Sequence, residues 1–221
     1  MTTGDEAVGV VLAAGAGRRM GAPKAELVVD GVRLLDRAIA TLRGGGCTEV
    51  IAVVRDGVSA SGARLVVNPD PDRGLASSLR LGLAAAETGG ADIAVVLLVD
   101  VPGVNADAVR RVRSTVAAAL AAGRPGLAVA TYSEGRGHPV ALSRPHWQQA
   151  AAAAYGDTGL RAFMQRNPDL VTEVPCHGDS RDLDTPADLR ALAACAIPAH
   201  DGRPRSLGNG GETQPPYAAP T

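Results

Sequence analysis

The segment Val8–Leu27 reads VGVVLAAGAGRRMGAPKAEL, and it decides the fold class. Its first five residues are nearly all apolar, which predicts a strand buried on both faces of a sheet. The loop that follows begins with small residues at positions 13–17, and we call it the small-residue loop. Gly15 and Gly17 can adopt positive φ angles, so that successive backbone N–H groups turn toward one concavity that binds phosphate oxygens. The segment therefore predicts a buried strand followed by a polyphosphate site.

Three basic side chains follow this loop, and one of them is unusual in this chain. Arg18, Arg19 and Lys24 lie close behind the glycines, and Lys24 is the only lysine among the 22 basic residues. A lysine ammonium group is a compact charge on a flexible stem, whereas a guanidinium group is a planar fork. The alternative is a compositional bias toward arginine that spared this position. We interpret Lys24 as a functional residue that contacts phosphate.

A dinucleotide-binding fold is the main alternative for a glycine-rich loop after a first strand. Residues 15–21 form a loose variant, G-x-G-x-x-x-G, of its fingerprint, and Arg55-Asp56 could imitate its ribose or 2′-phosphate contacts. That fold requires a helix to begin directly at the third glycine. Pro23 lies within those first turns and disfavours helical angles in the residue before it. We therefore expect the loop to continue through Lys24, which favours the polyphosphate site.

The composition sets the class of protein and excludes several partners. The chain has 221 residues, of which 46% are hydrophobic and 2% aromatic, which suits one α/β domain with a core of small side chains. The formal net charge of −1 gives no electrostatic footprint for nucleic acid or an anionic membrane. Three widely spaced cysteines predict neither disulfides nor a zinc site. With no export or membrane segment expected, we predict a cytoplasmic protein.

Apolar runs and helical patterns alternate along the chain. Strands are expected at residues 8–12, 50–54, 65–67, 93–99, 127–130, 139–142 and 170–174, with a polar turn at 132–138. Helices are expected at 34–42, 77–86, 106–120, 145–153, 158–164 and 186–194. This alternation predicts an α/β fold, a doubly wound three-layer sandwich with a mostly parallel sheet. The folded domain is expected to span residues 1–197, and residues 198–221 are expected to be a disordered tail.

Asp100 follows the most apolar strand, residues 93–99, which we expect at the centre of the sheet. Open α/β sheets bind ligands at the carboxyl ends of their strands. A carboxylate beside a polyphosphate is a suitable Mg²⁺ ligand. The alternative is an aspartate that only stabilises a turn or caps a helix.

Asp182 and Asp184 form a second acidic cluster. They lie two residues apart on a segment expected to be extended, so their side chains share a face. If that face points toward Asp100, one metal ion is held between two distant parts of the chain. The alternative is a structural role at the helix that Thr185-Pro186 begins, because acidic groups stabilise helix N-termini.

Ser77 and Ser78 open a helix after a proline-rich turn. Their hydroxyl groups either contact a nucleobase or ribose, or cap the helix. His138 lies in the polar turn, and we interpret it as a structural residue rather than a catalytic one.

Together these motifs resemble the signature of the nucleotidyltransferases related to the molybdenum cofactor cytidylyl- and guanylyltransferases, the MobA-like family. The resemblance begins with L-A-A-G-x-G-x-R-M-G-x-P-K at residues 12–24 and continues with N-P at 68–69 and R-G-L-A-S-S-L-R-x-G-L at 73–83. The later motifs are L-V-D-V-P at 98–102, G-H-P-V at 137–140, G-D-x-G-x-R at 156–161 and D-x-D-T-P-x-D-L at 182–189. They cover residues 8–192.

The resemblance implies a glycosyltransferase-A-like nucleotidyltransferase fold and transfer of a nucleotidyl group. Arg19 and Lys24 are expected on the phosphates of a nucleoside triphosphate, and Mg²⁺ is expected on Asp100 together with Asp184 or Asp182. A phosphate of the acceptor would attack the α-phosphorus, and pyrophosphate would leave. The residues expected to bind the nucleotide are Leu12, Ala13, Ala14, Gly15, Gly17, Lys24, Ser77 and Ser78.

Within the family, the L-A-A-G stretch and the G-L-x-S-S stretch resemble the cytidylyl branch. CTP is therefore the expected donor, and the terminal pterin phosphate of the molybdenum cofactor is the expected acceptor. A molybdoenzyme or its maturation factor is the expected protein partner. Asp100-Val101-Pro102 stands where cytidylyl members usually have Asp-Gln-Pro, and Ala25-Glu26-Leu27 replaces a leucine-rich run. These departures leave the acceptor and the base open.

Two other functions remain alternatives. Similar proteins include an oxidoreductase linked to nicotine degradation, so the chain could be a nicotinamide-dependent reductase, although no residue here indicates hydride transfer. It could also be a non-catalytic carrier of the molybdenum cofactor. Lys24, Arg19 and Asp100 argue against a carrier, because a carrier needs no triphosphate site.

Overall fold

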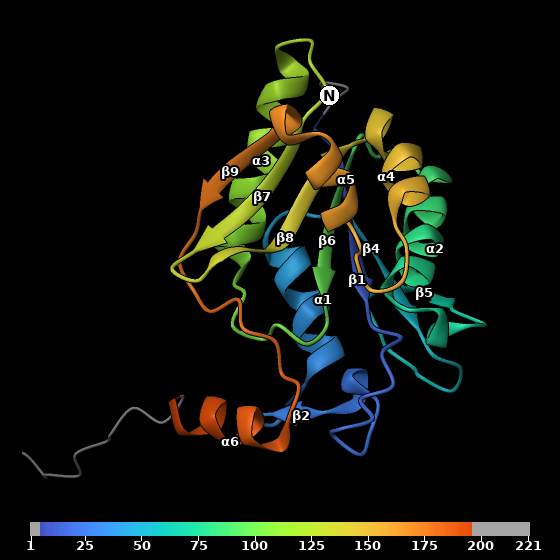
Figure 1. Cartoon of the computed structure of the whole chain (residues 1–221), viewed down its shortest axis with the longest axis vertical. Coiled ribbons are helices and arrows are strands. Elements are labelled where there is room, and N and C mark those ends of the chain that lie inside the picture. Colours follow the sequence, from blue (N-terminus) through green and yellow to red (C-terminus); the bar gives the residue numbers. More distant parts are fainter. Residues whose placement is uncertain (1–4, 196–221) are drawn as a thin grey trace, which may run out of the picture.

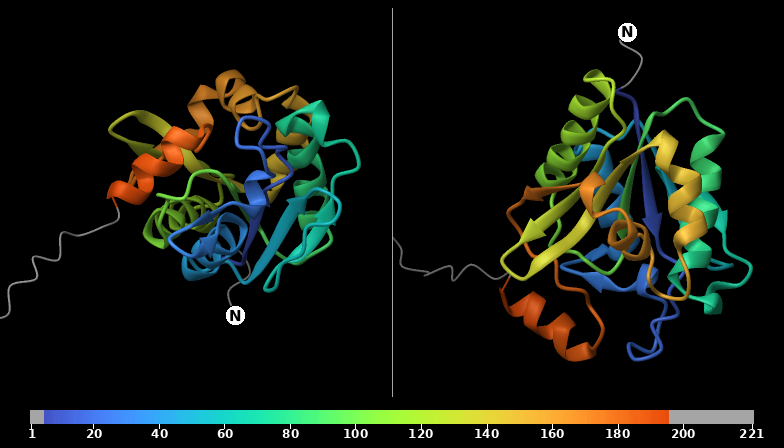
Figure 2. Two further views of the ribbon diagram at one scale, coloured as in Figure 1. Left: turned by 90° about the horizontal axis from the view of Figure 1, so that it is seen from below. Right: turned by 45° about the horizontal axis from the view of Figure 1, so that its top comes forward.

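The computed structural model describes residues 5–195. The expected tail at 198–221 and the expected domain end at residue 197 lie outside the described residues. A central sheet has helices on both faces, as Figure 1 and Figure 2 show. The prediction of a three-layer α/β fold is therefore confirmed.

Seven strands form the central sheet in the spatial order β5-β4-β1-β6-β8-β7-β9. Neighbouring strands are parallel except at β8, which is antiparallel to both β6 and β7. The predictions of a mostly parallel sheet and of a central β6 are confirmed. The strands are β1 (Ala7–Leu12), β4 (Glu49–Val54), β5 (Arg64–Val67), β6 (Ile93–Leu98), β7 (Leu127–Tyr132), β8 (Gly135–Ser143) and β9 (Val171–Pro175).

Helices cover both faces of the sheet. In the described part of the chain, α1 (Leu34–Gly44) and α3 (Ala106–Ala121) pack on one face. The other face is covered by α2 (Leu75–Glu87), α4 (Trp147–Ala153) and α5 (Arg161–Arg166). In Figure 1, α6 (Pro186–Cys195) and the hairpin of β2 (Val28–Val29) and β3 (Val32–Arg33) lie below the sheet. No helix within residues 5–195 is long and apolar enough to cross a membrane.

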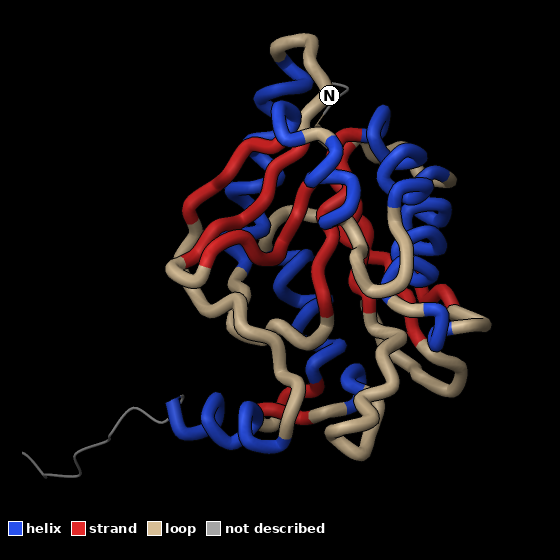
Figure 3. The backbone as a smooth tube through the Cα atoms, in the orientation of Figure 1, coloured by secondary structure: helices blue, strands red, loops and turns tan. Residues whose placement is uncertain are grey.

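The loops after β1, β4 and β6 emerge at the same edge of the sheet, because parallel neighbouring strands end together. Figure 3 shows these loops, drawn tan, gathered below the strands. This carboxyl edge is where α/β sheets bind their ligands. It brings the small-residue loop and Asp100 to one place.

β1 is buried along its whole length and contributes to both cores. Val8, Val10 and Leu12 face the cluster under α2, whereas Ala7 and Val11 face the cluster under α1 and α3. This alternation follows from the two-residue period of a strand. The prediction of a first strand buried on both faces is confirmed.

The polar turn predicted at residues 132–138 is wrong in its extent. β7 and β8 continue until only Ser133 and Glu134 separate them. Tyr132 Oη donates a hydrogen bond to His138 O at 2.7 Å, and the Arg136 guanidinium pairs with Glu173 on β9 at 2.7 Å. These tertiary contacts stabilise the polar residues 135–138 as part of β8, although their composition predicted a turn.

Three helix starts differ from prediction. α4 begins at Trp147 rather than at residue 145, after a 3-10 turn at Arg144–His146. The other two are set by distant or local side chains. α2 begins at Leu75 rather than at residue 77, since the Leu75 N–H donates to Asp157 Oδ1 at 3.1 Å. α5 begins at Arg161 rather than at residue 158, since the Thr158 hydroxyl donates to Tyr155 O at 2.8 Å and closes a turn. Neither partner could be identified from helical periodicity.

Two other predicted helix starts are confirmed. The Asn105 side chain accepts a hydrogen bond from Ala108 N–H at 3.0 Å and caps α3. Before α6, Asp188 Oδ2 accepts from Thr185 N–H at 2.7 Å, and Asp188 N–H donates to Thr185 Oγ1 at 3.3 Å. This reciprocal pair is a capping box, and it fixes the segment that carries Asp184.

Helix α2 lies so close to the sheet that Gly82 has no room for a side chain. A Cβ there would lie 2.5 Å from Val10 Cγ1 and 3.2 Å from Val53 Cγ2. We predict that Gly82→Ala lowers the free energy of unfolding by about 1–2 kcal/mol. The cost of overpacking exceeds the roughly 1 kcal/mol by which alanine favours a helix over glycine. Chemical denaturation measures the change.

Val10→Ala is the matched control, because it removes the methyl group that the new Cβ would meet. In that background, Gly82→Ala is expected to be neutral or stabilising, with a coupling energy above about 1 kcal/mol. If the effects of Gly82→Ala and Val10→Ala on the free energy of unfolding are additive within about 0.5 kcal/mol, the proposed contact between the two positions is contradicted.

Candidate active site

The small-residue loop connects β1 to a short 3-10 turn, η1 (Lys24–Glu26). Gly17 has a φ angle of +58°, and a Cβ there would lie 1.9 Å from Ala22 O, so glycine is required. Gly15, the other glycine for which we considered this conformation, does not have a positive φ, whereas Gly21 does. The loop ends one residue earlier than predicted, because η1 begins at Lys24 itself.

Lys24 lies between two carboxylates at the C-terminal end of this loop. Its Nζ is 2.7 Å from Asp100 Oδ2 and 2.6 Å from Asp184 Oδ1. The side chains of Lys24 and Asp100 are only 15% and 17% exposed. Burial lowers the pKa of Lys24, but the charges and hydrogen bonds of Asp100 and Asp184 outweigh it, so this pKa is raised. The ammonium group therefore stays protonated at neutral pH.

Three segments that are distant in the sequence bring this cluster together. Lys24 belongs to η1, Asp100 follows β6, and Asp184 precedes α6. The Leu183 N–H donates to Asp100 O at 2.8 Å, and the Leu183 side chain is buried. These contacts hold the segment before α6 against the end of β6.

Asp182 and Asp184 have different surroundings. Both line the cavity beside the small-residue loop, in agreement with their spacing on an extended segment. Asp184 contacts Lys24, whereas Asp182 is exposed and forms no ion pair with any residue that the structure describes. Of these two aspartates, Asp184 is therefore the one that Lys24 bridges to Asp100.

Arg19 lies at the outside of this cluster. Its side chain is 76% exposed, and its guanidinium is 3.7 Å from Asp184 Oδ2. Arg18 rather than Arg19 lines the cavity, and it pairs with Asp72 at 3.2 Å. The sequence indicated the basic character of this segment, but not which arginine faces the cavity.

Asp72 lines the same cavity, whereas Arg55 does not line it but contacts both Asp72 and the small-residue loop. The sequence did not identify Asp72, and it indicated Arg55 only as a contact of a dinucleotide-binding fold. Arg55 donates from Nε to Ala14 O and from Nη2 to Asp72 Oδ1, both at 2.9 Å. Arg55 directly follows β4, which pairs with β1. Its place at the carboxyl end of a neighbouring strand is the signal that could have identified it.

Ser77 and Ser78 lie in the first turn of α2, but neither caps the helix, because its N-cap residue is Gly74. The Asn68 side-chain amide donates hydrogen bonds to Ser77 Oγ at 2.8 Å and to Ser78 Oγ at 3.0 Å. Ser78 lines the cavity beside the loop, and Ser77 does not. The buried Asn68 thus orients both hydroxyl groups.

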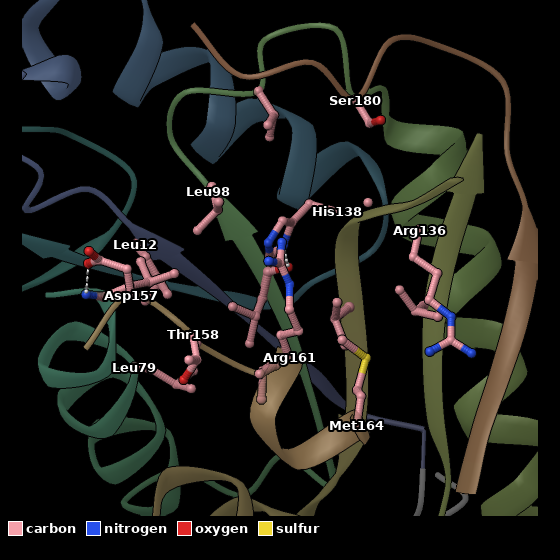
Figure 4. A pocket seen from close by; sticks show the side chains of 18 of the residues that line it. Leu12, Leu79, Leu98, Arg136, His138, Asp157, Thr158, Arg161, Met164 and Ser180 are labelled. Carbon is pink, nitrogen blue, oxygen red and sulfur yellow. Dashed lines mark hydrogen bonds between the residues drawn. The ribbon is translucent and has the colours of Figure 1, made fainter. Parts of the chain in front are cut away.

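Two adjoining cavities follow the carboxyl edge. The first, which we call the loop cavity, has a volume of about 560 Å³ and includes Lys24, Asp100 and Asp184 in its lining. The second, the His138 cavity, has a volume of about 550 Å³ and is lined by His138 and Arg161 among others (Figure 4). The residues common to both are Leu12, Leu75, Leu98, Asp157 and Asp182. The two cavities therefore form one groove with room for two ligands side by side.

Most residues expected to bind a nucleotide line the loop cavity. Ala13 does not, because it is buried and its N–H donates to Val53 O in the sheet at 2.8 Å. Those that line the cavity are Leu12, Ala14, Gly15, Gly17, Lys24 and Ser78.

His138 makes the structural contact expected of it and also faces a cavity. Its Nδ1 lies 3.3 Å from Val96 O, and since a carbonyl oxygen only accepts, we assign the ring proton to Nδ1. Burial lowers the pKa of His138 and outweighs the hydrogen bond to Val96 O and the charges of Asp100 and Asp182, which raise it, while Arg161 lowers it further. The neutral ring therefore carries an unprotonated Nε2.

The donor set around Lys24 suits a hard divalent cation. Asp100 and Asp184 approach a single positive group, the Lys24 ammonium. No cluster of three or more metal-binding side chains occurs among residues 5–195. Mg²⁺ commonly takes one or two carboxylates and completes its coordination with substrate phosphates and water. The two aspartates therefore fit a cation that binds together with a nucleotide.

The fold and this site are typical of the nucleotidyltransferase family. Residues 9–171 match the MobA-like NTP transferase domain family, and the chain belongs to that family. The match includes the small-residue loop, Lys24 and Asp100, and it ends before Asp184.

The chain is similar to three proteins that differ in their names. Nicotine blue oxidoreductase of Paenarthrobacter nicotinovorans is 37% identical over 202 residues, which cover 83% of this chain and 95% of that protein. Phosphoenolpyruvate guanylyltransferase of Sphaerobacter thermophilus is 33% identical over 129 residues, which cover 57% and 58% of the two chains. The structure of Rv0371c from Mycobacterium tuberculosis H37Rv has a TM-score of 0.74 and 30% identity, over 88% of this chain and all of that one. Rv0371c has also been solved as a complex with manganese, with a TM-score of 0.69 and 27% identity over 86% of this chain and 98% of that one.

Lys24→Met keeps a long side chain but removes its charge, so that Asp100 and Asp184 repel each other. We predict that the free energy of unfolding falls by about 1–3 kcal/mol, because Asp100 is largely buried. Mn²⁺ or Mg²⁺ is then expected to raise the melting temperature of the variant more than that of the wild-type protein. Thermal unfolding with and without each metal measures both effects.

Arg19→Met is the control, because it removes only a long, exposed contact with Asp184. Its free energy of unfolding is expected to change by less than about 0.5 kcal/mol. A Lys24→Met variant that matches the wild-type protein in both stability and metal response would contradict the assignment of Asp100 and Asp184 as a cation-binding pair.

Proposed function

We propose that the protein transfers the nucleoside monophosphate part of a nucleoside triphosphate to a phosphorylated acceptor and releases pyrophosphate. The observation that carries this proposal is the Lys24 ammonium group between Asp100 and Asp184, at the mouth of a loop of small residues. Membership of the MobA-like NTP transferase domain family supports it.

The donor triphosphate would lie in the loop cavity. Backbone N–H groups of the small-residue loop and the Lys24 ammonium would bind its oxygens, with Arg18 and Arg19 at the outer end of the phosphate chain. Asp100 and Asp184 would hold a divalent cation, which we propose to be Mg²⁺. When bound, this cation would supply positive charge to the phosphates. The manganese complex of Rv0371c supports a divalent cation in this family.

In the proposed reaction, an oxygen of the acceptor phosphate attacks the α-phosphorus of the triphosphate. A bond forms between that oxygen and the α-phosphorus. The bond from the α-phosphorus to the oxygen that bridges to the β-phosphorus breaks, and pyrophosphate leaves with the electron pair. The raised pKa of Lys24 supports a role as a fixed positive charge rather than as a base. Positioning and charge stabilisation are the main requirements of such transfers.

We propose CTP as the donor, because residues 12–15 and 74–78 resemble the cytidylyl branch of the family. For the acceptor we propose the terminal pterin phosphate of the molybdenum cofactor. The product would then pass to a molybdoenzyme or its maturation factor. The sparse, widely spaced cysteines support a cytoplasmic location.

A second candidate function is reduction of a small-molecule substrate by a nicotinamide cofactor, and one observation favours it. The 37% identity with nicotine blue oxidoreductase extends over 95% of that protein. A loop that binds a triphosphate also suits the diphosphate of a dinucleotide.

The test is pyrophosphate release with CTP, GTP, ATP or UTP in the presence of Mg²⁺, with and without molybdopterin, beside NADPH oxidation under the same conditions. We expect release that requires molybdopterin and is fastest with CTP. Dependence on another triphosphate would contradict the choice of base. Oxidation of NADPH without pyrophosphate release from any triphosphate would contradict nucleotidyl transfer.

Lys24→Ala tests the role of the ammonium group. We predict that the rate of pyrophosphate release falls by about a hundredfold or more, as when one preorganised donor is removed from a developing charge. Arg124→Ala is the control, because this exposed residue lies outside both cavities. Near-normal turnover by Lys24→Ala would remove this lysine from the mechanism.

A further inference from the structure

The His138 cavity contains an arginine, Arg161, whose guanidinium group forms no ion pair with any residue that the structure describes. Most arginines in the described part of the chain pair with a carboxylate or donate to a backbone carbonyl. The guanidinium groups of Arg124, Arg161 and Arg166 have neither kind of partner among residues 5–195. Of these three, only Arg161 lines the groove. Figure 4 shows Arg161 reaching from α5 toward His138 on β8.

Neither carboxylate of this cavity, Asp157 or Asp182, forms an ion pair with Arg161. Asp157 and Asp182 also line the loop cavity, so they lie at the boundary between the two halves of the groove. Arg136, the second arginine of the lining, is paired with Glu173. Among the described residues of this lining, the exposed Arg161 guanidinium is therefore the cationic group with which no carboxylate pairs.

Apolar side chains form the floor beside this charge. Val96, Val129 and Val140 come from three neighbouring strands, β6, β7 and β8, and Met164 comes from α5. A volume of about 550 Å³ lies within the range of pockets for ring-containing small molecules. An inorganic anion would leave most of this space unfilled.

We propose that Arg161 binds an anionic group of the acceptor, and that the acceptor has a ring-sized, partly apolar body that lies in the His138 cavity. This inference rests on the proposed function, which assigns the triphosphate to the loop cavity. The unprotonated Nε2 of His138 would accept a hydrogen bond from an N–H or O–H group of the same body. Arg161 is thereby a residue that determines which acceptors bind.

Isothermal titration with 1-naphthyl phosphate tests this assignment, because the probe combines one phosphate with an apolar ring system. The probe is titrated into the wild-type protein and the variants Arg161→Met, Arg166→Met and Lys24→Met, at fixed ionic strength and without nucleotide. Arg166 is the matched control, since it lies on the same helix but outside the groove. The uncharged 1-naphthol is titrated in parallel.

Arg161→Met is expected to weaken binding of 1-naphthyl phosphate about 10- to 100-fold, because it removes a charge-assisted hydrogen bond. Arg166→Met and Lys24→Met are expected to stay within about threefold of the wild-type protein. 1-Naphthol is expected to bind weakly and equally to all four. Unchanged binding to Arg161→Met, or a loss in Lys24→Met alone, would overturn the proposal, since the phosphate would then lie elsewhere.

Titration of CTP into the same proteins separates this inference from the proposed function. CTP affinity that depends on Lys24 but not on Arg161 supports the proposed function, whatever the naphthyl phosphate result. If none of the four triphosphates binds the wild-type protein, the proposed function fails. Binding of 1-naphthyl phosphate that depends on Arg161 would still support an anion-binding site in the His138 cavity.

Discussion

One ammonium group, that of Lys24, joins three separate parts of the chain at the carboxyl edge of the sheet. Asp100 and Asp184 lie within 2.7 Å of it, and without it two partly buried carboxylates would face each other. The ammonium group offsets one of these two negative charges, and Arg19, 3.7 Å from Asp184 Oδ2, lies near the other. This arrangement leaves two carboxylates ready for a divalent cation once phosphate oxygens offer Lys24 another partner. The lysine thus has a structural and a proposed catalytic role.

The groove depends on a second long-range contact, between the loop before α5 and the start of α2. Asp157 Oδ1 accepts a hydrogen bond from the Leu75 N–H, and a Cβ on Gly74 would lie 2.6 Å from the backbone of Gly156. Leu75 and Asp157 line both cavities. This contact therefore fixes the boundary between the loop cavity and the His138 cavity.

Much of the fold could be predicted from the sequence, because hydrophobic periodicity and parallel-strand rules are local. The burial of β1, the central place of β6 and the caps at Asn105 and Thr185 all follow from such patterns. The strand pairing around Arg136 and the start of α2 at Leu75 could not be predicted, since partners more than thirty residues away set them. For the same reason the sequence indicated Lys24 and Asp100, but it did not identify Asp72 or Arg161 as lining residues.

The central claim is that Lys24 and Asp100 act on the same bound nucleotide. A crystal structure with the α,β-methylene analogue of CTP and Mn²⁺ tests it most directly, because the anomalous signal of manganese locates the cation independently of the phosphates. We predict manganese on Asp100 and Asp184, and Lys24 Nζ within hydrogen-bond distance of a phosphate oxygen. Phosphates bound away from Lys24, or manganese on other residues while Lys24 still bridges the two aspartates, would contradict it.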